Sequence, residues 1–385
     1  MFSSRLKWGL PFTPLARLLD EKRSRGETIL DLTESNPTVA GFEYPADPIL
    51  AALADPRSLR YEPAPRGLSA AHAAIAEYYS GRVPTERILV TASTSEAYAF
   101  LFKLLCNPGD EVLAPRPSYP LFEFLAALDS VRIVQYPLVY HGRWAMDIDG
   151  LARSIGERTR AIILVNPNNP TGSFLRTDEL AELVRLCRDH RLALISDEVF
   201  SDYGWADDAR RVASLVEVDD VLTFSMSGLS KVSGLPQLKL GWIVVNGPAA
   251  ARRQASDNLE LIADTYLSVA TPVQWAAASL LRARRHLQPQ ILDRVRANRA
   301  FLAGQIGPNS PWRLLEAEGG WYAVIQAPRI RSEEEWALAL LAERQVLVQP
   351  GFFFDFETEA FLVVSLLTRP EIFREGVRRL IGPAV

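Results

Sequence analysis

The sequence predicts an α/β protein whose larger domain is a mainly parallel seven-stranded sheet with helices on both faces, joined to a smaller α+β domain. The chain has 385 residues, which is too long for one compact core and indicates about two domains. From about residue 66 to about residue 250, short aliphatic and β-branched runs alternate with longer segments of helical periodicity. After about residue 248 a long helical stretch follows, and then shorter mixed elements.

The expected elements divide the chain into three parts: an N-terminal arm over residues 1–45, a large domain over 46–270 and a small domain over 271–385. The arm carries Leu15, Leu18 and Leu19 on one helical face, so we expect it to pack on the small domain. In the large domain the expected strands are Ile88–Thr91, Glu111–Ala114, Val131–Val134, Ala161–Val165, Ala193–Ser196, Val221–Phe224 and Leu240–Val245. In the small domain they are Trp321–Ile325, Gln345–Val348 and Phe361–Ser365, before a last helix from Pro370.

The amino-acid composition indicates which kind of partner the protein binds. Hydrophobic residues make up 48% and charged residues 23%, as in an ordinary soluble globular protein, and the net charge of -4 gives no reason to expect nucleic acid or an anionic membrane. A small-molecule substrate is therefore expected. Two cysteines in helix-like segments, without a signal peptide or an apolar span, suggest a cytoplasmic protein. The four histidines are scattered and predict no metal site: His72, His141, His190 and His286.

Polar residues follow three of the expected strands, where open α/β sheets bind ligands. Asn169 lies in the turn-forming run 166–172 (Asn-Pro-Asn-Asn-Pro-Thr-Gly), Asp197 ends an apolar strand, and Lys231 is the one charged residue between Phe224 and Gln237. Each has a simpler interpretation: a tight loop for Asn169, a solvated loop residue or a helix cap for Asp197, and a surface lysine for Lys231. Together they suit pyridoxal phosphate, because a lysine amine can hold its aldehyde as an imine, a carboxylate can keep its ring nitrogen protonated, and an amide can donate to its ring oxygen.

These three motifs, in this order, resemble the fold-type I pyridoxal phosphate enzymes, and specifically the class I/II aminotransferases, over nearly the whole chain. The resemblance implies a pyridoxal 5'-phosphate-dependent aminotransferase that moves an amino group from an amino acid to a 2-oxo acid by a ping-pong cycle. Lys231 would form the aldimine and transfer the α-proton, while Asp197 would hold the ring protonated. It also implies a homodimer with shared active sites.

The resemblance adds further candidate residues. Ser93, Thr94 and Ser95 match the helix start that holds the cofactor phosphate through backbone amides, although a serine there can also be only a helix cap. Tyr119 matches the aromatic ring that stacks on the pyridine. The other matches are Ser230 and Lys239 at the phosphate, Tyr61 reaching the phosphate of the neighbouring subunit, and Asn36, Pro37 and Arg369 as substrate-binding residues.

Three positions depart from the family pattern. Phe200 stands where a tyrosine often donates to the ring oxygen, and Lys239 replaces an arginine. Val363 occupies the usual place of the arginine that binds the substrate's α-carboxylate, so Arg369 or Arg66 would have to act from elsewhere. The aromatic runs Trp321–Tyr322 and Phe352–Phe354 resemble segments that line the substrate end of the cleft, but core packing explains them equally well.

The departure at Val363 keeps two alternatives open. One is a lyase or decarboxylase that uses the same cofactor on the same fold. The other is a cofactor-binding protein without turnover, such as a regulatory descendant of an enzyme, although the chain has no DNA-binding extension and its chemical residues are intact.

Overall fold

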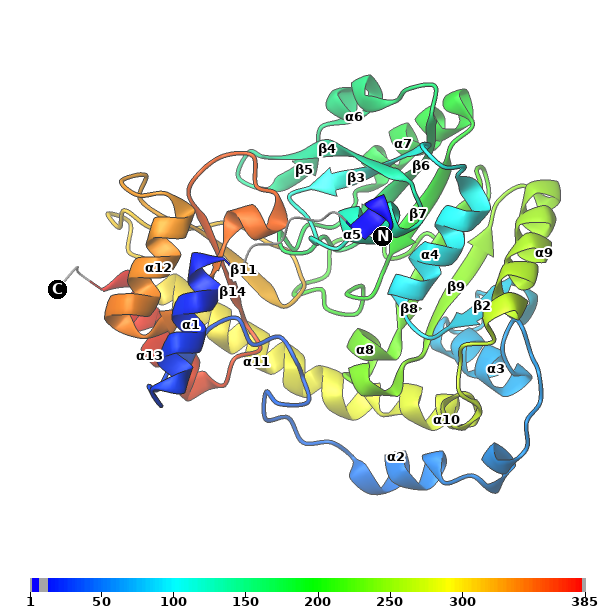
Figure 1. Cartoon of the computed structure of the whole chain (residues 1–385), viewed down its shortest axis with the longest axis horizontal. Coiled ribbons are helices and arrows are strands. Elements are labelled where there is room, and N and C mark those ends of the chain that lie inside the picture. The colour runs from blue at the N-terminus through cyan, green and yellow to red at the C-terminus, as the bar shows by residue number, and fades with distance from the viewer. Residues whose placement is uncertain (1, 7–12, 383–385) are drawn as a thin grey trace.

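A computed structural model describes residues 2–6 and 13–382 of the chain. Its main feature is one sheet in which parallel strands form the centre and antiparallel strands lie towards both edges (Figure 1). The strands follow one another across the sheet in the order β2 (Ile88–Thr91), β9 (Gly241–Asn246), β8 (Thr223–Gly228), β7 (Ala193–Asp197), β6 (Thr159–Val165), β3 (Glu111–Arg116), β4 (Arg132–Tyr140) and β5 (Trp144–Met146). The seven expected strands are all present.

The sheet has one strand more than the sequence predicted. β5 pairs antiparallel with the end of β4 as a short hairpin, through pairs such as Val139 with Ala145. Three residues containing one buried tryptophan carry too little pattern to be recognised as a strand. At the other edge, β9 runs antiparallel to both of its neighbours, so the sheet is mainly and not wholly parallel, as expected.

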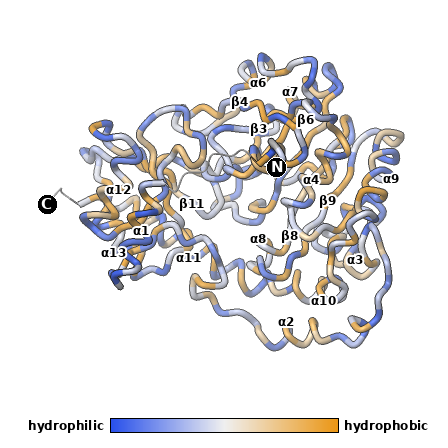
Figure 2. Tube along the Cα trace, viewed as in Figure 1, coloured by the Kyte–Doolittle hydropathy of each residue, from blue (hydrophilic) through white to orange (hydrophobic). Residues whose placement is uncertain are grey.

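Helices cover both faces of this sheet, because its inner strands are apolar on both sides. One face packs against α4 (Thr94–Leu105), α5 (Phe122–Leu128) and α9 (Ala249–Tyr266). The opposite face packs against α6 (Ile148–Ser154), α7 (Thr177–His190), α2 (Ala46–Leu53), α3 (Ser69–Tyr78) and α10 (Thr271–Arg282). Figure 2 shows hydrophobic residues along the inner strands and a mixture of hydrophobic and hydrophilic residues along the helices.

The small domain is an antiparallel sheet covered by helices, on the left of Figure 1. Its strands are β10 (Arg313–Leu314), β11 (Tyr322–Gln326), β14 (Phe361–Ser365) and β13 (Gln349–Pro350), and β1 (Leu30–Asp31) pairs separately with β12 (Val346–Leu347). Its helices are α1 (Pro14–Ser24), α11 (Arg284–Gln305), α12 (Glu333–Arg344) and α13 (Pro370–Ile381). Leu15, Leu18 and Leu19 of α1 pack in its core, as the periodicity predicted.

Two contacts favour different domain limits from those that the sequence suggested. α10 packs on α2 and α3 beside β2 and β9, so residues 271–282 share a core with the large sheet. Thr271 and Pro272 are the first two residues of α10, so they begin a helix and need not begin a domain. At the other end, the short 3-10 helix Ser4–Leu6 lies beside α5, where Arg5 donates to the Leu128 carbonyl at 2.9 Å. We propose that the division falls near the start of α11, which runs from α10 to the small sheet (Figure 1).

The remaining elements are short. α8 (Leu229–Val232) is a single turn directly after β8, and the other 3-10 helices are Pro56–Leu59, Thr85–Arg87, Pro236–Leu238 and Gly351–Phe354. None of the helices within residues 2–6 and 13–382 is long and apolar enough to cross a membrane.

Candidate active site

A cavity of about 200 Å³ lies at the carboxyl ends of the central strands. It is lined by seven of the residues that the sequence singled out for cofactor binding: Thr94, Ser95, Tyr119, Asn169, Asp197, Ser230 and Lys231. Each lies at or soon after the end of a strand, and neighbouring parallel strands end at the same edge of the sheet. Segments far apart in the sequence thereby meet around one space.

The loop after β6 aims Asn169 into the cavity. The Asn168 side chain holds this loop by donating to the Pro117 carbonyl at 3.0 Å and to Thr171 Oγ1 at 2.9 Å, and it accepts from Ser118 Oγ at 3.1 Å. Asn169 is buried, and its side-chain oxygen has no hydrogen-bond partner among the described residues. This oxygen is an acceptor, so a ligand that carries a hydrogen-bond donor would complete it, whereas the Nδ2 amide nitrogen of the same side chain is the group that could donate to a ring oxygen.

Asp197 is the last residue of β7, and its carboxylate is buried at the cavity wall. Burial raises the pKa of Asp197 to about 6, against the opposing effects of the Val199 backbone N–H and of Tyr98, whose hydroxyl donates to Oδ2 at 3.2 Å. A cationic ring nitrogen in this place would favour the ionised carboxylate. Tyr98 was missed from the sequence, although it lies one helical turn after Thr94 on the helix that opens at the cavity.

Lys231 lies on α8, and its amine is surrounded by aromatic rings. Nζ is 4.9 Å from the Trp321 ring centroid and 5.5 Å from that of Phe200. Burial lowers the pKa of Lys231 to about 8, partly offset by the charge of Asp197. The free amine, which is the form that reacts with an aldehyde, then makes up about a tenth of Lys231 at pH 7, far more than for an ordinary exposed lysine.

The start of α4 forms another wall of the cavity through Thr94 and Ser95. The first backbone N–H groups of a helix have no carbonyl partner within the helix, so they can bind a phosphate. Ser93 does not line the cavity. Instead it caps α4, its Oγ accepting from the Glu96 N–H at 3.1 Å. The helix-cap interpretation thus describes Ser93, while its two neighbours face the cavity.

Several other candidates lie outside the cavity lining. Lys239 is exposed after the 3-10 helix Pro236–Leu238, and Tyr61 is 70% exposed in the loop before α3. Asn36 is also exposed and Pro37 is buried near Gly234, whereas their neighbour Ser35 lines the cavity. Arg369 lies over Gly41 and donates to the Val39 carbonyl at 3.3 Å.

The structure also places the positions that depart from the family pattern. Phe200 lines the cavity and offers no hydroxyl. Val363 is fully buried in an apolar cluster with Val324 and Phe354, and does not face the cavity. Arg66, the second candidate to replace an arginine there, donates to the Glu86 and Ile88 carbonyls near β2. Among the described lining residues Lys231 is the single cation.

The aromatic residues of the small domain fall into two groups: some lie at the cavity, and others pack elsewhere. Tyr322 lines the cavity, and Trp321 is buried with its ring towards Lys231. Phe354 packs in the apolar cluster around Val363, and Phe352 is partly exposed. The sequence did not identify Phe122, Leu125, Val165 and Val199 as lining residues, since apolar side chains near strand ends look the same as core residues.

Comparison with known proteins agrees with this geometry. The sequence matches the family described as "Aminotransferase class I and II" over residues 27–380. Glutamate-pyruvate aminotransferase AlaA of Escherichia coli K12 is 30% identical over 370 residues, which cover 92% of this chain and 90% of that protein. An Escherichia coli aminotransferase structure superposes with a TM-score of 0.87 at 26% identity, over 99% of this chain and 97% of the other. Alanine aminotransferase from Pyrococcus furiosus gives 0.88 at 24% identity, over 98% of each chain.

The chain therefore belongs to the class I and II aminotransferase family, whose members use pyridoxal 5'-phosphate. It is a pyridoxal 5'-phosphate-dependent aminotransferase with the fold-type I architecture.

Proposed function

We propose that this enzyme transfers the amino group of an amino acid with a small or apolar side chain to a 2-oxo acid. The observation that carries the proposal is the convergence of Lys231, Asp197 and Asn169 on one cavity whose other walls include Phe200 and Tyr322. Leu125, Val165 and Val199 add further apolar surface. A substrate with a second carboxylate would find no cation among the described lining residues except Lys231.

The roles of the cofactor-binding residues form part of the proposal. Lys231 Nζ would hold the aldehyde carbon of pyridoxal 5'-phosphate, Asp197 the ring nitrogen and Asn169 the ring oxygen. Tyr119 would cover the ring face, and the α4 amides of Thr94 and Ser95 would hold the phosphate, with Ser230 beside them. When bound, the cofactor supplies an aldehyde and a protonated ring that withdraws electrons from the substrate's α-carbon.

The chain itself supplies the proton transfer. With a pKa lowered to about 8, the Lys231 amine can accept a proton from the substrate α-carbon and return one near neutral pH. Trp321 and Phe200 exclude water from this amine on two sides. Asp197 stays ionised against a cationic ring and is held in place by Tyr98 and the Val199 N–H.

Assembly and location are further proposals. Tyr61 does not line its own cavity and is 70% exposed, which supports a homodimer in which Tyr61 reaches the partner's phosphate site. Cys106 and Cys187 are both free thiols, which supports a cytoplasmic location.

A substrate panel with product identification tests the proposed reaction. The purified holoenzyme, given alanine, leucine, methionine, glutamate or aspartate with a 2-oxo acid acceptor, should convert small or apolar donors to their 2-oxo acids and form one new amino acid per donor consumed. Faster turnover of aspartate than of every apolar donor would contradict the specificity. Release of ammonia or CO₂ without an acceptor would instead support the lyase or decarboxylase alternative.

A further inference from the structure

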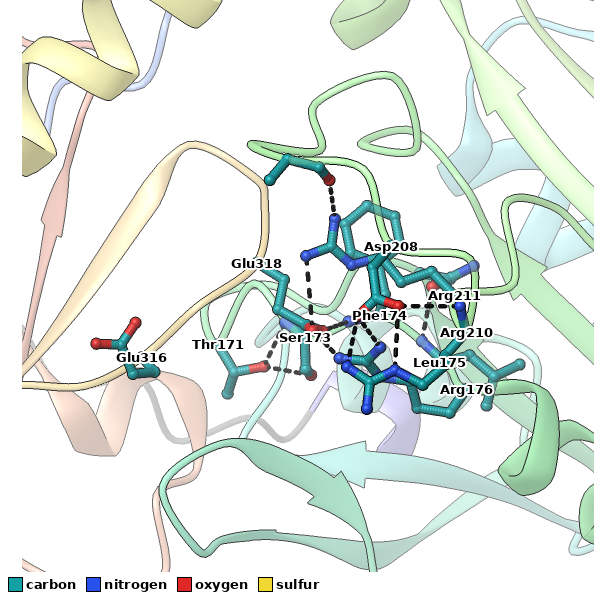
Figure 3. Close-up of polar contacts among 12 residues, drawn as sticks. Thr171, Ser173, Phe174, Leu175, Arg176, Asp208, Arg210, Arg211, Glu316 and Glu318 are labelled. Carbon is teal, nitrogen blue, oxygen red and sulfur yellow. Dashed lines mark hydrogen bonds and ion pairs between the residues drawn. The ribbon is translucent and has the colours of Figure 1, made fainter.

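A cluster of charged side chains lies where the segment before β11 meets the loop after β6 (Figure 3). Arg176, whose side chain is only 6% exposed, forms ion pairs with Glu318 and, at 2.6 Å, with Asp208. Arg211 approaches the same Glu318 oxygen at 3.6 Å. Asp208 also pairs with Arg210, and these two arginines hold its pKa well below the ordinary range. The side chains of Arg176, Arg211 and Glu318 are largely removed from water, whereas that of Arg210 is 77% exposed.

Glu318 connects this cluster to the large sheet through backbone as well as side-chain groups. Its Oε2 accepts from the Phe174 N–H at 3.0 Å, and its own N–H donates to the Gly172 carbonyl at 3.0 Å. Its carbonyl accepts from the Trp205 N–H at 2.9 Å. One residue from the C-terminal third of the chain is therefore bonded to two separate loops of the large domain.

The contact is also tight. Gly172 adopts φ +67°, and a Cβ built there would collide with the Gly319 carbonyl oxygen. A Cβ at Gly319 would lie 2.6 Å from the Tyr203 carbonyl oxygen and 2.8 Å from the Phe174 ring. Glycines on both sides of the contact let the two backbones approach more closely than side chains would permit.

Both chain segments that form this contact also carry residues at the cavity. Gly172 belongs to the loop that carries Asn169, and Glu318 lies shortly before Trp321 and Tyr322. Trp321 covers the Lys231 amine, and Tyr322 lines the cavity. A shift of Glu318 relative to Arg176 would therefore move Asn169 and Tyr322 relative to each other.

Stability alone is a weak explanation for such a cluster, because burying ions costs much of what their attraction returns. Loss of one member would leave the Arg176 charge incompletely compensated in a dry environment. A network of this kind is better suited to fixing one arrangement of its segments than to adding stability.

We propose that Glu318 and Arg176 are positioning residues that hold the Asn169 loop and the Trp321–Tyr322 segment in register around Lys231. The inference rests on the proposed cofactor site, since it assigns these residues a role in setting that site's geometry. Neither side chain lines the cavity, so each acts through the segment that carries it.

Glu318→Gln tests the proposal, because it removes the charge and keeps an oxygen that can accept from Phe174. Glu316→Gln is the matched control: Glu316 lies on the same segment, its side chain is 66% exposed, and it pairs at 2.8 Å with Arg299, away from the cluster. Three properties would be compared with wild type: hydrogen exchange without cofactor, the pH titration of the visible absorbance band with cofactor, and KM and kcat.

Glu318→Gln should raise deuterium uptake in peptides covering both 166–175 and 316–322 before any cofactor is added. With cofactor, the midpoint of the pH titration should shift, and KM should rise about 3–10-fold with a smaller change in kcat, the scale expected when binding groups are misplaced by a fraction of an ångström. Glu316→Gln should match wild type in all three. A purely stabilising role would lower the melting temperature of Glu318→Gln and leave the pH midpoint and KM unchanged.

The inference is overturned if exchange rises in only one of the two segments, or if the pH midpoint and KM of Glu318→Gln equal those of wild type. Its failure differs from failure of the proposed function. If only the positioning role is wrong, the wild-type enzyme still forms the visible band and still turns over substrate. If wild type forms no band, the proposed function fails and the positioning role in cofactor binding is rejected with it, whatever the exchange shows.

Discussion

At the scale of single residues, folding makes two neighbouring carboxylates difficult to ionise, and one of them, Asp197, lines the cavity. Burial raises the pKa of Asp197 from 3.8 to about 6, and burial likewise raises that of its neighbour Glu198 from 4.5 to about 6. As the pH rises from about 4 to above 6, the unfolded chain releases these protons before the folded protein does. The cofactor-free protein therefore loses stability over this interval through both groups.

Asp197→Asn should stabilise the cofactor-free protein at pH 7.5 by on the order of 2 kcal/mol, because the amide carries no charge to desolvate. The gain should be much smaller near pH 4, where the wild-type carboxyl group is already protonated in the folded state. Urea unfolding of wild type and variant at pH 7.5 and near pH 4 measures the stability gain at each pH. The variant should also lose most of its transaminase activity, since an amide cannot keep a ring nitrogen protonated.

Glu198→Gln is the control for that experiment. Glu198 is equally buried but accepts from Ser214 and from the Leu215 N–H at 2.8 Å, away from the cavity lining. It should share the pH-dependent stability gain and retain cofactor binding. An Asp197→Asn variant that is less stable than wild type at pH 7.5 would contradict the argument about desolvation.

At the scale of elements, the decisive feature is the loop after β6 and its contact with the segment before β11. Gly172→Ala should destabilise the protein by clearly more than the about 1–2 kcal/mol that a left-handed backbone costs an alanine, because its Cβ also meets the Gly319 carbonyl. Gly142→Ala separates the two effects: Gly142 has φ +82° and no atom within 4 Å of the added Cβ. Chemical unfolding measures the free energy of unfolding of both variants. If both lose the same amount, the collision between the added Cβ at position 172 and the Gly319 carbonyl is relieved at no cost.

Particular elements show how far the sequence could predict the structure. Strand ends could be placed because short apolar runs ended in Asn, Asp or Ser-Lys motifs, and these brought Asn169, Asp197 and Lys231 to one cavity. The cluster of Arg176 and Glu318 could not be predicted from the sequence, because the two residues are 142 positions apart in the chain. In addition, exposed ion pairs consist of the same residue types as buried ones. The sequence could not show which domain α10 packs on, because Thr and Pro at a helix start look the same wherever that helix packs.

At the scale of the whole molecule, the exposed Tyr61 predicts that active sites are shared between two copies of the chain. Tyr61→Ala and Lys231→Ala should each be nearly inactive at limiting cofactor. Mixing the two by unfolding and refolding them together should restore about a quarter of wild-type activity, since half of the random dimers are hybrids with one intact site each. No recovery, in a mixture shown to contain hybrid dimers, would place Tyr61 in its own subunit's site or outside both.

The central claim is that Lys231, Asp197 and Asn169 form one pyridoxal 5'-phosphate site that carries out transamination. The most direct test is the absorbance spectrum of wild type and of Lys231→Ala, each purified with cofactor, gel-filtered and then mixed with excess L-alanine in the absence of a 2-oxo acid. Wild type should keep a visible band that alanine converts to the aminated cofactor's near-ultraviolet band, with one pyruvate released per site, whereas Lys231→Ala should show neither the band nor pyruvate. An identical visible band in both proteins, or none in wild type, would contradict the assignment of Lys231 and with it the account of the site.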